Sequence, residues 1–241
     1  MLIILAGSHD GTARELAIRW PNTALLTPCD LSRRGWRHEN TACANGSTVT
    51  AGGCAVISGK IVQVEMISAI YNRLPWVFKH ELSEIRKEDK QYVAAEMNAF
   101  LLSWLSSLRC PVVNRPSPLG LAGPNLRPEA WTLLAARENI PVRPVLRGSS
   151  GYQADDVPRL DVVTVVGEQC FGHVDFVMQR QAQSLAKAAG VELLTLAFDC
   201  GASDAPFIWA EPWADVKIPG VENAILNLLR EPVATERNAA L

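Results

Sequence analysis

The chain has 241 residues, 48% of them hydrophobic and 20% charged, with a formal net charge of −2. This is ordinary globular composition with enough apolar residues for a sizeable core. There is no basic excess that would indicate a nucleic-acid partner, no acidic excess typical of disorder, and no apolar run near the roughly 20 residues that a membrane span needs. The N-terminus, MLIILAG, lacks the basic segment of a signal peptide, so we expect a cytoplasmic protein.

The first third of the chain begins as a β-α-β unit. The apolar run at residues 2–7 predicts a buried strand, and Ser8 or Asp10 can cap the helix that follows it. Residues 23–28 predict a second strand, and a β-α-β crossover implies parallel strands covered by helices. A polar, Gly-rich stretch at 30–53, in which STVTA alternates like a strand, then leads into two or three strand-like runs in residues 54–74.

A long helix is predicted in residues 87–108, whose apolar face is too broad for an exposed helix. The segment CPVVNRP at 110–116 indicates a short buried strand that enters a loop rich in Pro and Gly. Pro128 suits the first turn of the next helix, PEAWTLLAAREN. The polar segment at 147–159, RGSSGYQADDVPR, is typical of a linker.

The last third alternates strands and helices. A β-run, LDVVTVVGEQCFG, precedes a helix that Gly190 ends, and VELLTLAFD and APFIWAEP predict two paired strands. The last helix is GVENAILNLLREP. The six cysteines include no C-x-x-C pair, their spacing fits no zinc finger, and the four histidines are scattered, so we expect reduced thiols and no His-based metal site.

Several of these phrases, in this order, resemble ATP-grasp enzymes. They are SAIYNRLP, CPVVNRP followed by RPEAWTLLAARENIPV, VVTVVGEQCFG, and AKAAGVELLTLAFD followed by FIWAEPWAD. The likeness is to the carboxylate–amine ligases that modify ribosomal peptides and to related glutamate ligases. Such enzymes use Mg-ATP to convert a carboxylate to an acyl phosphate, which an amine then attacks. Their magnesium ligands are an Asp, a Glu and an Asn, because Mg²⁺ prefers hard oxygen atoms.

The resemblance implies an α/β (mixed α+β) fold, with an N-terminal parallel-sheet domain of the pre-ATP-grasp type and a truncated ATP-grasp-like C-terminal domain. The family carries a lid subdomain where this chain has a short linker, which cannot hold a hydrophobic core of its own. We therefore predict that the lid is absent. The predicted parts are an N-terminal domain at 1–116, a connecting loop and helix at 117–146, a linker at 147–158, the truncated core at 159–232 and a tail at 233–241.

The family's metal ligands are changed in this sequence. By the resemblance, Ala197 stands in place of the Asp, Trp209 in place of the Glu and Glu211 in place of the Asn, while Val162 replaces an Arg. The nearest acid to Ala197 is Asp199, which should lie on the same face of the strand. Asp199 and Glu211 are thus the only candidates for a metal site.

Other residues keep the family's type. Arg73 and Asn114 match it, and Arg127 lies near the family's helix-opening Lys. Arg73 could bind a carboxylate or phosphate or form a structural salt bridge, and Asn114 could simply stabilise the Pro-rich loop. Glu211 could bind a ligand or cap a turn. A cation at a helix start opposes the helix dipole, which favours an anion near Arg127.

Three functions follow as alternatives. In the first, the chain is a degenerate ATP-grasp-like protein that has lost ligase activity and needs no cofactor. It would bind a peptide, a small acid or a partner enzyme, in peptide or small-molecule modification. In the second, it is an active Mg-ATP-dependent ligase, and in the third the fold is repurposed for another reaction. Fold alone does not decide among them. The resemblance also implies a homodimer.

Overall fold

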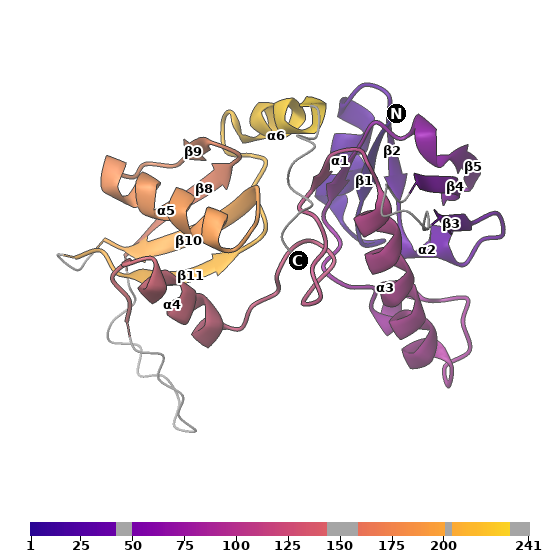
Figure 1. The fold of residues 1–241 in the computed structure, drawn as a ribbon, viewed down its shortest axis with the longest axis horizontal. Helices are drawn as coiled ribbons and strands as arrows, with labels where there is room; N and C mark the ends of the chain where they lie inside the picture. Colours follow the sequence, from indigo (N-terminus) through magenta and orange to yellow (C-terminus); the bar gives the residue numbers. More distant parts are fainter. Residues whose placement is uncertain (42–49, 144–158, 201–203, 232–241) are drawn as a thin grey trace. The chain divides into compact units, whose positions relative to one another are not determined.

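The computed structural model describes residues 1–41, 50–143, 159–200 and 204–231 (Figure 1). The chain divides into two compact units, one formed by Met1–Gly123 with Asn227–Leu241 and one by Pro124–Leu226. The predicted linker at 147–158 and the predicted tail at 233–241 lie outside the described residues.

The first unit is built on a parallel sheet. Its strand order is β2 (Thr23–Leu26), β1 (Leu2–Leu5), β6 (Ala69–Asn72) and β7 (Val112–Val113). Helix α1 (Gly11–Arg19) connects β1 to β2, and the side chain of Asp10 caps it by accepting the N–H of Ala13 at 2.9 Å. The predicted β-α-β opening with parallel strands is therefore confirmed.

A second, antiparallel sheet in this unit contains β3 (Arg37–Thr41), β4 (Thr50–Ile57) and β5 (Lys60–Gln63). Ser58 and Gly59 join β4 to β5 with φ of 50° and 74°, as a tight hairpin turn with two left-handed residues requires. Two short helices contact β4, α2 (Pro28–Leu31) and η1 (Val64–Met66), and a third, η2 (Lys79–Glu81), contacts α3.

Helix α3 (Lys90–Ser107) is the longest helix described, and its buried side chains join the core around the parallel sheet. Those side chains are Ala94, Leu101, Trp104 and Leu105. The buried face is narrower than the sequence pattern predicts, because Tyr92 is 69% exposed.

The second unit contains a four-stranded antiparallel sheet, in the order β11 (Phe207–Glu211), β10 (Leu193–Asp199), β8 (Leu160–Val166) and β9 (Gln169–Phe171). Helix α4 (Pro128–Arg137) packs on β11 and α5 (Phe176–Ala188) on β8 and β10 (Figure 1). The predicted pairing of the two strands that became β10 and β11 is confirmed. Helix α6 (Val221–Arg230) follows them.

Alternate residues of this sheet face the two helices. The core between sheet and helices contains Val163, Val165, Leu194, Leu196 and Phe198 from the strands, with Trp131 and Ala135 from α4 and Met178, Ala182 and Leu185 from α5. The intervening strand residues point to the opposite face, since side chains alternate along a strand. One parallel and two antiparallel sheets confirm the predicted mixed α/β class. None of the described helices is long and apolar enough to cross a membrane.

Candidate functional site

The sheet of the second unit, β8 to β11, has one face toward α4 and α5. Its other face carries three of the positions that the resemblance identifies with ATP-grasp site residues. Ala197 of β10 lies directly opposite Val162 of β8 on one side and Trp209 of β11 on the other. Residues opposite one another on adjacent strands project from the same face. The three side chains therefore form one row, which we call the apolar row. Ala197 is fully buried, Val162 is 37% exposed and Trp209 is partly buried.

A polar row runs beside it, two residues along each strand. Thr195 lies opposite both Thr164 and Glu211. The hydroxyl oxygens of Thr164 and Thr195 are 2.9 Å apart, and Thr195 donates to the carbonyl of Trp213 at 2.5 Å. Because a hydroxyl has one hydrogen, Thr164 must donate to Thr195. Both buried hydroxyls are thus used to fix the segment after β11.

Glu211 ends β11, at the edge of the polar row. The residue is exposed to solvent, yet the partial burial of its carboxyl raises its pKa. Desolvation disfavours the ionised form, which is the form that coordinates Mg²⁺. Glu211 therefore supplies a single carboxylate at the edge of the polar row.

Asp199 is the last residue of β10, and its carboxylate is paired with an arginine. It is 3% exposed, and its carboxylate forms an ion pair with Arg143, whose side chain is half exposed. Arg143 follows Val142, which forms a bridge with Phe207 at the start of β11. This contact fastens the segment after α4 to the sheet.

The structure does not bring Asp199 and Glu211 together. Glu211 pairs with Thr195, which is four residues from Asp199 along β10. Four residues of strand span about 13 Å. Strand side chains stand roughly perpendicular to their sheet, so the two carboxylates are too far apart to share one magnesium ion. Across the described ranges, no group of three or more His, Cys, Asp or Glu side chains could hold a metal.

In the first unit, the carboxyl ends of the parallel strands bring together Arg73 after β6 and Asn114 after β7. Arg73 is 4% exposed. It donates to Asp10 Oδ2 at 2.9 Å and to the Tyr71 hydroxyl at 3.1 Å. Burial raises the pKa of Tyr71, which keeps the phenol neutral beside the guanidinium. The geometry is that of a structural ion pair that joins β6 to the start of α1.

Asn114 is 1% exposed, and its main-chain carbonyl lies within reach of a buried amide, that of Asn72. The side chain of Asn72 donates to the carbonyl of Leu121 at 2.6 Å and to that of Asn114 at 3.5 Å. It also accepts the N–H of Leu74 at 3.2 Å. These contacts of the Asn72 side chain hold the loop after β7 through its main chain.

A buried carboxylate that sequence reasoning missed lies at the same edge of this sheet. Glu81 is 7% exposed, and it accepts the N–H of Ser8, just after β1, at 2.9 Å and the N–H of Phe78 at 3.3 Å. The carboxyl edge of a parallel sheet is a common place for anionic ligands. Here the protein's own carboxylate fills part of it. No local sequence pattern predicts this contact, because Ser8 and Glu81 are 73 residues apart in the chain.

Arg127 occupies the N-cap position of α4, directly before Pro128, and its side chain is exposed. Its main-chain carbonyl accepts the N–H groups of Ala130 and Trp131. This carbonyl thus accepts the first main-chain bonds of the helix, and the Arg127 side chain is exposed.

Solved structures provide the comparison with known proteins. The crystal structure of the macrocyclase MdnC from Microcystis aeruginosa MRC, bound with precursor peptide MdnA, matches with a TM-score of 0.64 at 12% identity, over 96% of this chain and 100% of that one. The ATP-grasp ligase PsnB, complexed with minimal precursor, Mg and ADP, matches with a TM-score of 0.60 at 12% identity, over 95% and 98%.

A third structure agrees with these two. The ligase from Chryseobacterium gregarium, described as associated with ribosomally synthesised and post-translationally modified peptides and solved with ADP and a leader and core peptide, has a TM-score of 0.57 at 11% identity, over 89% and 90%. No family model and no curated protein matches the sequence. The chain therefore has an ATP-grasp-like fold.

Proposed function

We propose that this chain is an ATP-grasp-like protein that has lost Mg-ATP-dependent ligase activity and acts as a binding protein in peptide modification. Its ligand is a peptide or a partner enzyme. The observation that carries the proposal is the apolar row, in which Val162, Ala197 and Trp209 lie side by side in register. The resemblance assigns an arginine and two acidic metal ligands to those same three positions.

Phosphoryl transfer makes this replacement decisive for the chemistry. Magnesium bridges the phosphates and neutralises the charge that develops on them, and its protein ligands are oxygen atoms. Methyl groups and an indole ring supply none. Of the two acids nearby, Asp199 is paired with Arg143, and Glu211 lies about 13 Å from Asp199, too far for the two to share one ion.

The peptide part of the proposal is supported by the structural neighbours. MdnC was crystallised with a precursor peptide and PsnB with a minimal precursor. A protein that keeps this fold without its metal ligands can keep peptide binding, since that needs surface complementarity and no metal.

Isothermal titration calorimetry with Mg-ATP tests the loss of the nucleotide site. We expect no binding heat at millimolar nucleotide, with PsnB as the positive control, because its structure holds Mg and ADP. A micromolar Kd for this chain would contradict the proposal. ADP release in the presence of mixed acids, amines and candidate peptides would support the alternative of an active ligase.

A further inference from the structure

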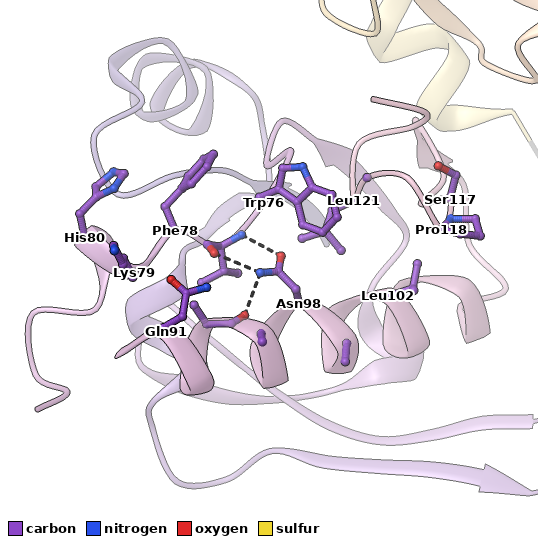
Figure 2. Close-up of a pocket in the computed structure, with 15 residues that line it drawn as sticks. Trp76, Phe78, Lys79, His80, Gln91, Asn98, Leu102, Ser117, Pro118 and Leu121 are labelled. Atoms are coloured by element: carbon purple, nitrogen blue, oxygen red, sulfur yellow. Dashed lines mark hydrogen bonds between the residues drawn. The ribbon is translucent and has the colours of Figure 1, made fainter. Parts of the chain in front are cut away.

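A groove of about 570 Å³ lies on the first unit, and its lining includes none of Arg73, Asn114, Arg127 and Glu211 (Figure 2). Its floor is helix α3 from Gln91 to Leu102, and its walls are the segment 76–80 and the turn 117–121. The volume lies within the usual range for ligand pockets. Its length is that of eleven helical steps, about 16 Å, which matches about five residues of extended peptide.

Hydrogen bonds hold one wall of the groove in place. Asn98 of α3 accepts the N–H of Val77 at 2.9 Å and donates to the carbonyl of Val77 at 3.0 Å (Figure 2). Its amide also donates to the carbonyl of Ala94 at 2.8 Å. The other wall is fixed to the same segment, because the N–H of Leu121 donates to the carbonyl of Pro75 at 3.0 Å. The groove is thus formed before a ligand arrives, which lowers the entropic cost of binding.

The lining divides into an apolar stretch and a cationic end. Trp76 and Leu121 lie over the middle of α3, where Ala95 and Ala99 are small enough for a ligand backbone to approach the helix (Figure 2). At one end stand Lys79 and His80 with Gln91 (Figure 2). Phe78 stacks on His80 at 5.4 Å and is 45% exposed. The lining includes no Asp or Glu.

We propose that this groove binds a short extended peptide segment that carries an acidic residue beside apolar ones. The apolar side chains lie against Trp76 and Leu121, and the carboxylate lies at the Lys79 end. The occupant follows from charge complementarity, since the only full positive charge in the lining is Lys79 and there is no negative one. Alternate side chains of an extended segment face the groove, so two or three of its residues contact α3.

This inference rests on the proposed function, which states that the chain binds a peptide. It adds the place where the peptide binds and the kind of peptide that binds there. The probes are two fluorescein-labelled synthetic hexapeptides, one with two Asp among Leu and Phe, the other with Lys in place of each Asp. Fluorescence anisotropy with the full chain should show the acidic peptide binding at least ten times more tightly. Equal affinity for both, or no binding of either, would overturn the proposal.

Two variants locate the site, each with a matched control. Lys79→Glu should weaken binding of the acidic peptide about tenfold, whereas Lys87→Glu, exposed and outside the lining, should change it less than twofold. Ala99→Arg places a long side chain in the groove and should weaken binding about thirtyfold, whereas Ser106→Arg, exposed on the same helix beyond the groove, should not. All four positions are exposed, so we expect each variant to fold.

The remaining outcomes separate the two proposals. If the acidic peptide binds but Ala99→Arg has no effect, the groove is not the site, and the proposed function stands. If Ala99→Arg removes the peptide site in a chain that also binds Mg-ATP with micromolar affinity, the groove proposal stands and the loss of the nucleotide site is wrong. Self-association in sedimentation that Ala99→Arg abolishes would identify a second copy as the occupant and overturn the peptide proposal.

Discussion

The ion pair of Arg73 and Asp10 should be worth more than an ordinary surface salt bridge. Arg73 is 4% exposed and Asp10 15%, so removing one partner leaves a charge largely without water. Asp10 also caps α1. We consider two substitutions: Asp10→Asn removes the charge but keeps an oxygen that can cap the helix, and Asp10→Ala removes both.

The magnitudes follow from these two roles. Breaking a buried pair by removing one partner costs about 3–5 kcal/mol, which is the expected loss of unfolding free energy in Asp10→Asn. Losing the N-cap adds about 1 kcal/mol, so Asp10→Ala should lose about 4–6 kcal/mol. Adding Arg73→Met to Asp10→Asn removes the buried charge and should restore all but about 2 kcal/mol.

Native-state hydrogen exchange is the suitable assay, because the two units can unfold separately and a single transition need not describe both. The slowest amides of β1 and β6 report the unfolding free energy of the first unit. A loss below about 1 kcal/mol in Asp10→Asn would refute the reasoning, since that is the value of a solvent-exposed pair. A double variant no more stable than the single one would also refute it.

Three further predictions concern other positions. Gly172→Ala should destabilise the protein by about 2 kcal/mol or more in thermal unfolding, because φ is +135° and a Cβ would lie 2.3 Å from a carbonyl oxygen of β8. The control is Gly11→Ala in α1, where there is open space around the glycine, and this variant should be more stable than the parent protein. Iodoacetamide at pH 8 should label exposed Cys200 well before Cys110, because burial raises the Cys110 pKa to about 11 and leaves about a thousandth of it as thiolate; equal rates by mass spectrometry would contradict this. Burial raises the pKa of Tyr71 in the folded state. The contribution of the neutral phenol to the unfolding free energy is therefore complete below pH about 10 and is lost as the pH rises further. Tyr71→Phe should flatten this decline of the unfolding free energy in urea titrations between pH 9.5 and 11.

Local patterns predicted most of the strands and the longer helices of both units, but not α2 or β3, which lie at and after the start of the polar, Gly-rich stretch. Continuous apolar runs identified β1 and β10, and the single crossover implied that β1 and β2 are parallel. The width of the buried face of α3 was overestimated. Helical spacing shows which residues are apolar, but not which of them another element covers. Tyr92 is exposed, and Ala95 lines the groove. The groove itself depends on Asn98 meeting Val77 across 21 residues.

The candidate site was predictable only in part. The resemblance identified the changed positions, but it did not show that Val162, Ala197 and Trp209 form one row. That alignment depends on strand register, and β11 shifts its register next to Ala197. The separation of Asp199 from Glu211 has the same origin. The partner of Arg73 lies 63 residues away, and composition and spacing carry no information on such a pair.

The apolar row also limits how this chain can change by mutation. Ala197 is fully buried between Val162 and Trp209. A carboxylate introduced there alone would be a buried charge with no cation opposite it in register, which is strongly destabilising. A carboxylate at Trp209 alone would give up the packing of an indole ring and still lack the second ligand. Each single step back toward a metal site is thus a loss of stability without a gain in activity. If an ancestor of this chain held magnesium here, reversion would require several substitutions together. The apolar row would therefore make the loss of the metal site hard to reverse by single mutations.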